Sequence, residues 1–311
     1  MSFVGKRTVF VKILWIGSIN WFDGKNYVVY PHTAGAVSSS AFEQAIIEGL
    51  EGWGHKVRIL SDWDNDAGKR FEWSHNHEQR DITVPGISIK YVRLFYKAWA
   101  MRRELERNEF LLKNVDVTVI YSVHVPYFSL LRKIKRINPN CKIVLVCPDL
   151  SEYMDPSIKK KPLKRMLRKL ESLYIHCQAR EIDGVIWFAE KMKEILPITA
   201  PSIVIEGVFS LSNIDAEDAK EEKRCVAYAG SLNSNFGIQN IIRAFEKLQD
   251  IDLELWIFGT GEMENELKQI CSHNRRVKFF GFVDRHSMFE YEKTAMLLIN
   301  ARDPKEEIGR A

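Results

Sequence analysis

The sequence predicts an α/β protein built from two doubly wound units, each a parallel sheet covered by helices on both faces. Short, almost continuously apolar segments alternate with longer segments of helical periodicity, and this alternation starts again after a polar stretch. Near-continuous apolar strands are typical of parallel sheets that are buried on both faces. The length of 311 residues is also more than one hydrophobic core normally serves. We therefore expect two domains.

The first unit is expected to open with a strand over residues 9–17, a helix over 41–53 and a strand over 56–60, which make one parallel crossover. The same alternation then predicts strands at 115–121, 142–147 and 184–188, and helices at 127–137, 162–180 and 190–196. Residues 61–86 are polar and rich in Asp, His and Trp, so we expect an excursion from the sheet there.

A linker is predicted at residues 210–223, where the composition shifts to Asp, Glu, Lys, Ser and Asn. It separates a first domain at 1–209 from a second at 224–311. In the second domain the pattern predicts strands at 224–230, 253–258, 277–280 and 296–300, with helices at 237–248, 262–273 and 285–294.

Composition and charge narrow the class of protein. The hydrophobic fraction is 46%, which excludes a disordered chain. The formal net charge is only +4 and no nucleic-acid recognition motif is present, so we expect no nucleic-acid partner. Five cysteines without a C-x-x-C pair predict neither a disulfide framework nor a metal site, and they fit a cytoplasmic location.

Glycine turns follow successive strands of the second unit. Gly230 and Ser231 follow the first strand, and Gly259, Gly261 and Glu262 follow the second; a third turn begins at Gly281. Carboxyl ends of parallel strands share one edge of a sheet, and helix N-termini there bind phosphate groups. One such turn alone could be a plain strand-to-helix connection, and Glu262 could simply be a first-turn acid on the helix dipole. Three turns in register favour a nucleotide site.

These residues carry a resemblance to a known family. The stretch 228–302, with YAGSLNSNFGIQNIIRAFEKL, LELWIFGTGEMENELK, VKFFGFVDRHSMFEY and LLINAR, resembles the donor-binding domain of retaining glycosyltransferases of family 4, which have the GT-B fold of two Rossmann-like domains. In the first unit, TAGAVSSSAFEQAIIEGLEGWGHKV, VCPDLSEYM and GVIWFAEKMKEIL are similar to segments of the acceptor-side domain. In character the chain is most like bacterial capsule and exopolysaccharide transferases.

The resemblance implies transfer of a sugar, with retention, from a nucleotide-diphosphate donor to a saccharide or polyprenyl-linked acceptor in cell-surface polysaccharide synthesis. It implies a UDP-sugar as co-substrate and neither a metal nor another cofactor. It also implies a donor domain of which roughly 60 to 80 further residues would follow, so that the chain is C-terminally truncated. The implied donor-binding residues are Gly35, Gly230, Ser231, Gly259, Gly261, Glu262 and Arg302. Many relatives have Arg and Lys in the first donor loop, where this chain has Ser231 and Phe236.

The same resemblance makes His124 and Asp149 the candidate catalytic residues. His124 matches a histidine that many relatives direct at the donor sugar, and Asp149 follows the strand at 142–147 on the acceptor side. His124 could instead be a hydrogen-bonded turn histidine, and Asp149 an Asx-turn or helix cap. Gly35 could merely precede a helix.

A basic helical segment at 159–170 contains seven basic residues and no acidic one. Its leucines and methionine fall on one helical face, which predicts contact with an anionic membrane surface through Lys160, Lys164, Arg165 and Arg168. We therefore expect a cytoplasmic protein that binds peripherally to the inner face of the plasma membrane. The alternative is a solvated basic face over the sheet.

Two other classes of function are alternatives for this sequence. One is an inactive relative of the family that acts as a binding protein or is a non-functional fragment. The other is a Rossmann-type dehydrogenase or epimerase, which would need G-x-G-x-x-G after the first strand. That motif is not present there.

Overall fold

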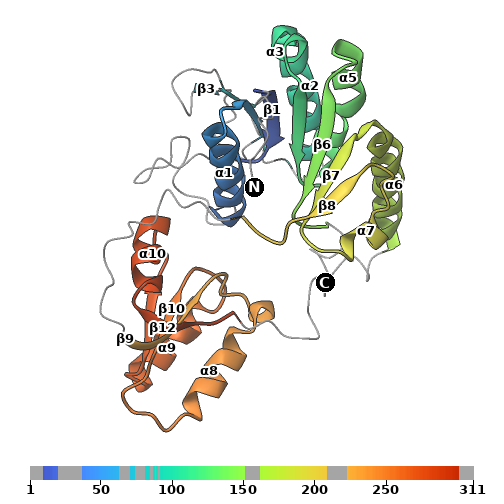
Figure 1. The fold of residues 1–311 in the computed structure, drawn as a ribbon. Helices are drawn as coiled ribbons and strands as arrows, with labels where there is room; N and C mark the ends of the chain where they lie inside the picture. Colours follow the sequence, from blue (N-terminus) through green and yellow to red (C-terminus); the bar gives the residue numbers. More distant parts are fainter. Residues whose placement is uncertain are drawn as a thin grey trace. The chain divides into compact units, whose positions relative to one another are not determined.

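The computed structural model describes residues 10–19, 37–62, 71–73, 81–84, 87, 89, 92–150, 162–208 and 223–300. The chain divides into two compact units, with the division between residues 210 and 211 (Figure 1). Each unit has its own sheet, and we describe each one by itself.

The sheet of the first unit has its strands in the order β3-β4-β2-β1-β5-β6-β7-β8. All neighbouring strands are parallel except β3, which is antiparallel to β4. The strands are β1 (Lys12–Gly17), β2 (Lys56–Ser61), β3 (Phe71–Trp73), β4 (Asp81–Thr83), β5 (Val117–Tyr121), β6 (Lys142–Cys147), β7 (Gly184–Trp187) and β8 (Ser202–Val204). The winding reverses between β1 and β5, the position at which open α/β sheets bind ligands.

Helices cover both faces of this sheet because side chains alternate along its buried strands. Leu14 and Ile16 of β1 pack with one set of helices, while Ile13 and Trp15 pack on the opposite face with α1. The helices are α1 (Val37–Gly52), α2 (Arg93–Arg107), α3 (Glu109–Lys113), α4 (Val125–Phe128), α5 (Leu131–Ile137), α6 (Pro162–Gln178) and α7 (Met192–Ile195), with a 3₁₀ turn η4 (Ala179–Glu181). Residues of α2, α4, α5 and α6 belong to the first cluster.

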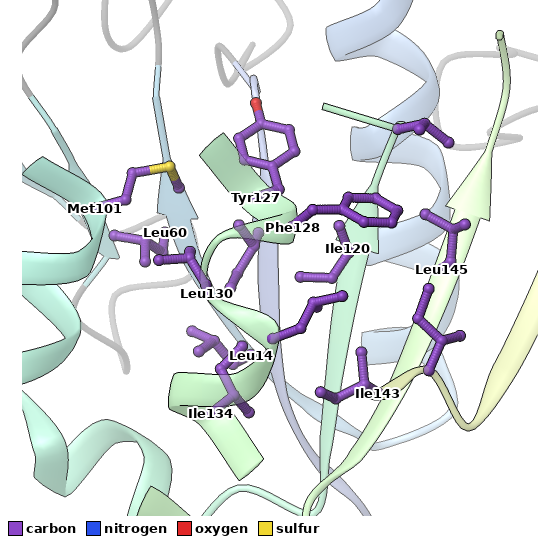
Figure 2. Packing of buried hydrophobic residues seen from close by; sticks show 14 of the residues in the cluster. Leu14, Leu60, Met101, Ile120, Tyr127, Phe128, Leu130, Ile134, Ile143 and Leu145 are labelled. Carbon is purple, nitrogen blue, oxygen red and sulfur yellow. The ribbon is translucent and has the colours of Figure 1, made fainter. Parts of the chain in front are cut away.

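Figure 2 shows this first cluster around α4 and α5. Phe128, Leu130 and Ile134 pack against strand residues such as Ile120, and all four are buried. The ring of Tyr127 joins them, but its hydroxyl group points away from the apolar side chains. The core therefore extends to the carboxyl edge of the sheet, and the Tyr127 hydroxyl group is buried there.

The second unit has four parallel strands in the order β11-β10-β9-β12. Helices α8 and α9 pack on one face and α10 on the other, so this unit is also doubly wound. Its elements are β9 (Lys223–Ala229), the 3₁₀ turn η6 (Ser234–Phe236), α8 (Ile238–Glu246), β10 (Glu254–Phe258), α9 (Glu264–His273), β11 (Val277–Gly281), α10 (Arg285–Glu292) and β12 (Ala295–Leu298).

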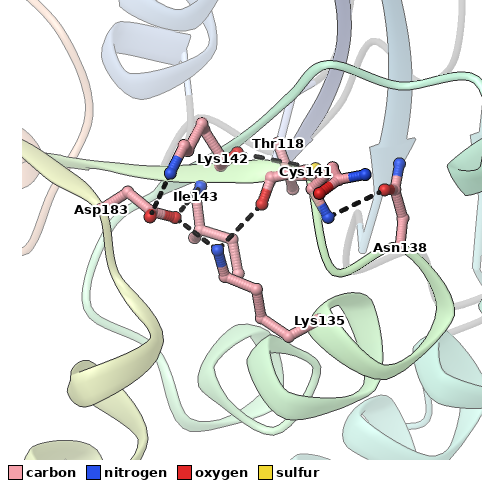
Figure 3. Close-up of polar contacts among 8 residues, drawn as sticks. Thr118, Lys135, Asn138, Cys141, Lys142, Ile143 and Asp183 are labelled. Carbon is pink, nitrogen blue, oxygen red and sulfur yellow. Dashed lines mark hydrogen bonds and ion pairs between the residues drawn. The ribbon is translucent and has the colours of Figure 1, made fainter.

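A polar cluster fixes the amino-terminal ends of β6 and β7, away from the carboxyl edge (Figure 3). Asp183 accepts hydrogen bonds from the backbone N–H of Ile143 at 2.8 Å, from Lys135 at 2.6 Å and from Lys142 at 3.2 Å. Burial alone would raise the pKa of Asp183, but these hydrogen bonds outweigh it and lower the pKa.

The predicted fold class is confirmed: the protein is α/β with two parallel-sheet units. Most predicted strands and helices are present, with bounds shifted by a few residues. The segment expected as one helix at 127–137 is two short helices, because the chain turns at Ser129 and Leu130 between α4 and α5. The sequence reasoning missed β3, β4, β8, α2 and α3. Within the excursion expected at 61–86, β4 adds a parallel strand beside β2. The linker predicted at 210–223 lies outside the described residues except for its last residue.

Candidate functional site

The glycine turns of the second unit lie side by side at its carboxyl edge. Gly230 and Ser231 follow β9, and Gly259 and Gly261 follow its neighbour β10. Backbone hydrogen bonds join the two loops: Gly230 donates to the carbonyl of Phe258 at 3.1 Å, and Leu232 donates to that of Thr260 at 2.9 Å. The candidate donor site is thus a double loop with a shared backbone.

Close packing explains why these positions are glycines. Gly259 has a φ of +128°, and a Cβ atom there would collide with the carbonyl oxygen of Gly230. A Cβ atom on Gly261 would press on the backbone of Leu232. The two loops are thus packed backbone against backbone, and α8 and α9, whose N-termini favour an anion, begin immediately behind them.

Glu262 holds the two loops together. Its carboxylate accepts a hydrogen bond from the backbone N–H of Ser234 at 2.8 Å, and its own N–H donates to Asn233 Oδ1 at 3.2 Å. The hydrogen bond from Ser234 lowers the pKa of Glu262. Because the Glu262 carboxylate binds the backbone of the first loop, it can affect ligand binding by fixing the position of that loop.

At the carboxyl edge of the first sheet, His124 and Asp149 follow the neighbouring strands β5 and β6. His124 is at the N-cap position of α4, but its side chain does not cap that helix. Asp149 is exposed. The structure therefore places both predicted catalytic residues at one edge, and β1, where the winding reverses, is the other neighbour of β5.

Asp62 is the polar centre of this edge, and sequence reasoning missed it. It directly follows β2 and is almost completely buried. Tyr127 donates its hydroxyl hydrogen to Asp62 Oδ1 at 2.5 Å, Lys97 Nζ lies 3.2 Å from Oδ2, and His124 Nδ1 lies 4.0 Å from the same oxygen. The rings of His124 and Tyr127 meet edge to face, with centroids 5.0 Å apart. Burial, followed by the charge of Asp62, raises the pKa of Tyr127, so this phenol stays protonated.

A second buried carboxyl group, Glu43 of α1, lies beneath the same edge. Trp15 Nε1 donates to Glu43 Oε2 at 2.6 Å, and the backbone N–H of Ser18 donates to Oε1 at 3.3 Å. Burial raises the pKa of Glu43 from 4.5 to about 8, since desolvation outweighs the hydrogen bond from Trp15. Glu43 is therefore a neutral acid at pH 7, fixed between β1 and α1.

The backbone at the end of β5 is strained. Ser122 is a non-glycine residue with a φ of +79°, and its N–H donates to the carbonyl of Val146 on β6 at 2.8 Å. Such conformations persist where the surrounding structure enforces them, and they concentrate at functional sites. Here the strained residue sets the direction of the chain that presents His124.

A small pocket lies on the inner side of α6. It is lined by Val123 and Leu150, the neighbours in sequence of His124 and Asp149, and by Arg168 and Ile175 of α6 among others. Arg168, a predicted membrane residue, pairs with Glu171 at 3.5 Å on this pocket-facing side. Its side chain therefore lies on the side of α6 that faces Val123 and Leu150.

Several predicted residues are only partly covered. Gly35, Lys160 and Arg302 lie outside the described residues. Lys164 and Arg165 lie in the first turn of α6, where the backbone alone is described. Among the described ranges, no cluster of His, Cys, Asp and Glu could hold a metal ion, and no helix is long and apolar enough to span a bilayer.

One feature of the sequence could have identified Asp62 as a candidate site residue. A carboxylate immediately after a buried parallel strand is the same pattern that singled out Asp149, but the polar excursion beyond β2 obscured it. Glu43 and Lys97 carry no comparable signal, because each lies inside a helix among other charged residues.

Comparison with known proteins relates the second unit to a known family. Residues 211–310 match a family model described as "Glycosyl transferases group 1". No curated protein sequence matches the chain significantly. Among solved structures, the apo form of the lipopolysaccharide outer core galactosyltransferase WaaB is 13% identical, with a TM-score of 0.54 over 94% of this chain and 74% of its own.

Two further structures are similar at the same level. The catalytic domain of starch synthase IV from Arabidopsis thaliana, bound to ADP and acarbose, is 9% identical with a TM-score of 0.57, over 93% of this chain and 78% of its own. Anabaena HepE in complex with UDP-glucose is 13% identical with a TM-score of 0.57, over 94% and 74%. The protein thus has the fold of GT-B glycosyltransferases, and its second unit matches the group 1 glycosyltransferase domain.

Proposed function

We propose that this protein is a retaining glycosyltransferase that moves a sugar from a nucleotide-diphosphate donor to a saccharide or polyprenyl-linked acceptor in cell-surface polysaccharide synthesis. The observation that carries the proposal is the pair of joined glycine loops after β9 and β10, within the unit that matches the glycosyltransferase family model. UDP-glucose bound to the similar HepE structure supports a UDP-sugar as donor.

The loops suit a diphosphate because they present backbone rather than side chains. Gly230, Gly259 and Gly261 let the two loops pack against each other, and the N-terminal dipoles of α8 and α9 behind them add positive potential. No metal or protein cofactor has a role in this proposal. The loop bearing Ser231 contributes no positive side chain, so the backbone would provide most of the stabilisation.

In the proposed reaction, the bond between the anomeric carbon and the diphosphate oxygen breaks, and an acceptor hydroxyl forms the new glycosidic bond on the same face. The acceptor proton passes to the departing diphosphate oxygen, so no protein carboxylate need act as nucleophile. The N-termini of α8 and α9 behind the donor loops would stabilise the negative charge that develops on the leaving group.

His124 would contact the donor sugar, and Asp149 would orient the acceptor hydroxyl. Support for the first role comes from the strained backbone at Ser122 and from the packing of the imidazole against Tyr127, which together limit its orientations. Support for the second is the exposed position of Asp149 beside His124 at the carboxyl edge.

We also propose that the protein works in the cytoplasm, bound peripherally to the inner face of the plasma membrane through the basic helix α6. The support is its basic composition, with Lys164, Arg165 and Lys169 in addition to Arg168, which pairs with Glu171 on the pocket-facing side. A membrane-bound location would bring the enzyme to a lipid-linked acceptor.

Calorimetry with UDP-glucose, GDP-mannose and ADP-glucose tests the donor assignment. We expect one of them to bind, and binding should be lost in Gly261→Val, whose side chain would displace the backbone of Leu232. The matched control is Gly52→Val at the end of α1, where a Cβ atom meets nothing within 4 Å. If none of the three binds to the wild-type chain, the enzyme proposal fails and a binding protein of another kind is favoured.

Chemistry is tested by the release of the nucleoside diphosphate from the donor that binds. His124→Ala should lower the rate about tenfold or more, while the control His273→Ala at the exposed end of α9 should not change it. The sugar released at early times should keep the anomeric configuration of the donor. Inversion, seen by NMR, would contradict a retaining mechanism.

A further inference from the structure

Helix α6 has its apolar face toward solvent. Met166 and Leu170 are exposed, and Leu173 is 68% exposed. The opposite face of the same helix lines the pocket with Ser172 and Ile175, among others. A helix that covers a sheet normally buries its apolar stripe. Here a second apolar stripe faces outward, and nothing among the described residues covers it.

Helix α2 presents a similar outward surface. Phe95 is 78% exposed and Trp99, one turn later, is 52% exposed. The guanidinium group of Arg103 stacks over the Trp99 ring, 5.0 Å from its centroid. The inward face of α2 is the polar one at this end, since Lys97 is buried against Asp62. Sequence reasoning did not predict this helix.

The two exposed stripes lie on one layer of the fold. Both α2 and α6 contact α4 on the same face of the eight-stranded sheet. The charge of Arg102 on α2 lowers the pKa of Tyr174 on α6, although burial raises it more. The outward sides of the two helices therefore belong to the same side of the unit.

This outer surface is basic as well as apolar. On α2, Arg93, Arg102, Arg103 and Arg107 are exposed beside one exposed acid, Glu106, and on α6 Lys169 is exposed. Exposed Glu106 pairs with Lys133 at 3.0 Å, and Glu171 pairs with Arg168 at 3.5 Å, so these acids are neutralised locally. Aromatic rings, leucines and arginines on one surface are the composition that binds the interface of an anionic bilayer.

We propose that the outer sides of α2 and α6 form one membrane-binding surface, in which Phe95 and Trp99 insert at the level of the lipid headgroups beside Leu170 and Leu173. This rests on the membrane location in the proposed function and extends it from one basic helix to two helices with apolar anchors. It is independent of the transfer chemistry, because no donor or acceptor is needed for lipid binding.

The test is co-sedimentation of the full chain with vesicles of phosphatidylcholine, with and without phosphatidylglycerol. Phe95→Ser with Trp99→Ser should weaken binding to the anionic vesicles about tenfold or more, as should Leu170→Ser with Leu173→Ser. The matched control is Trp53→Ser, since Trp53 is 77% exposed at the end of α1, which packs on the opposite face of the sheet. This variant should bind like wild type.

A second readout does not depend on affinity. Vesicles should shift tryptophan emission of the wild type to the blue, and the shift should shrink in Trp99→Phe although that variant still sediments with them. If the α2 double variant binds the anionic vesicles like the wild type, the inference is overturned. If only the α6 double variant loses binding, membrane contact through α6 alone is supported. If the wild type binds no anionic vesicles, or if the α2 variant instead abolishes self-association in sedimentation velocity, the surface has another partner. Calorimetry with nucleotide sugars reports on the proposed transferase activity separately.

Discussion

Gly17 leaves the space that the carboxyl group of Glu43 fills. A Cβ atom on Gly17 would collide with Glu43 Oε2 and would lie 3.0 Å from Trp15 Nε1. The end of a glutamate can usually move aside, but Glu43 is completely buried and is held by Trp15 and by the N–H of Ser18. The last residue of β1 and the middle of α1 are thus fitted to one another.

Gly17→Ala should therefore destabilise the protein by about 2 kcal/mol or more, because it displaces a buried hydrogen-bonded carboxyl group. Unfolding in urea, followed by circular dichroism, measures the loss. Gly49→Ala is the matched control: it lies in α1, and a Cβ atom there meets nothing within 4 Å. That change should stabilise the helix by about 0.5 to 1 kcal/mol. An equal effect of the two substitutions would contradict the packing argument.

The close approach of Gly259 to Gly230 yields a second prediction. Gly259→Ala combines a positive φ with a collision against backbone that cannot move aside, so it should cost about 3 kcal/mol or more. Gly281→Ala has a φ of +70° but open space around the Cβ position, and it should cost only about 1 kcal/mol. Urea unfolding of both variants separates strain from collision, and similar losses would show that the loops can spread.

The buried ion pair between Lys97 and Asp62 leads to a third prediction. Lys97→Met removes the cation and leaves Asp62 charged and buried, which should cost about 3 kcal/mol or more. Adding Asp62→Asn should recover a large part of that loss, because the amide still accepts from Tyr127 and carries no charge. If the double variant is as unstable as the sum of the two single variants, the charges are not coupled.

The sequence allowed the main strands to be predicted because their buried residues form nearly continuous apolar runs, as in β6. Strands β3 and β4 were missed because three residues are too few to show a period. Helix α2 was missed for a different reason: it buries Lys97 and Glu104 along with Ala100, Met101 and Leu105, and it exposes Phe95 and Trp99, so its apolar residues do not fall on one face. Its polarity follows from the charge of Asp62 within the fold and not from its own sequence.

The candidate site also has features that could be predicted from the sequence and features that could not. Glycine turns at strand ends could be predicted, since backbone constraints appear directly as residue type. The roles of Asp62 and Glu43 could not, because burial distinguishes them from other acids such as the neighbouring Glu48 and Glu51, and burial depends on long-range packing. The network among His124, Tyr127, Lys97 and Asp62 joins residues from three separate parts of the chain.

The neutral form of Glu43 makes stability depend on pH. The pKa of this group is about 8 in the folded protein and near 4.5 in the unfolded chain, so the folded state holds one more proton between these values. Stability from this group is therefore fully present below about pH 4.5, falls as pH rises through that window, and levels off above about pH 8. The total loss should be on the order of a few kcal/mol. Urea unfolding at pH 5 and pH 9 measures it, and Glu43→Gln, whose amide oxygen can still accept from Trp15, should lose less stability across this interval than the wild type. A glutamine variant that follows the wild-type pH dependence would mean that Glu43 is already ionised in the folded protein.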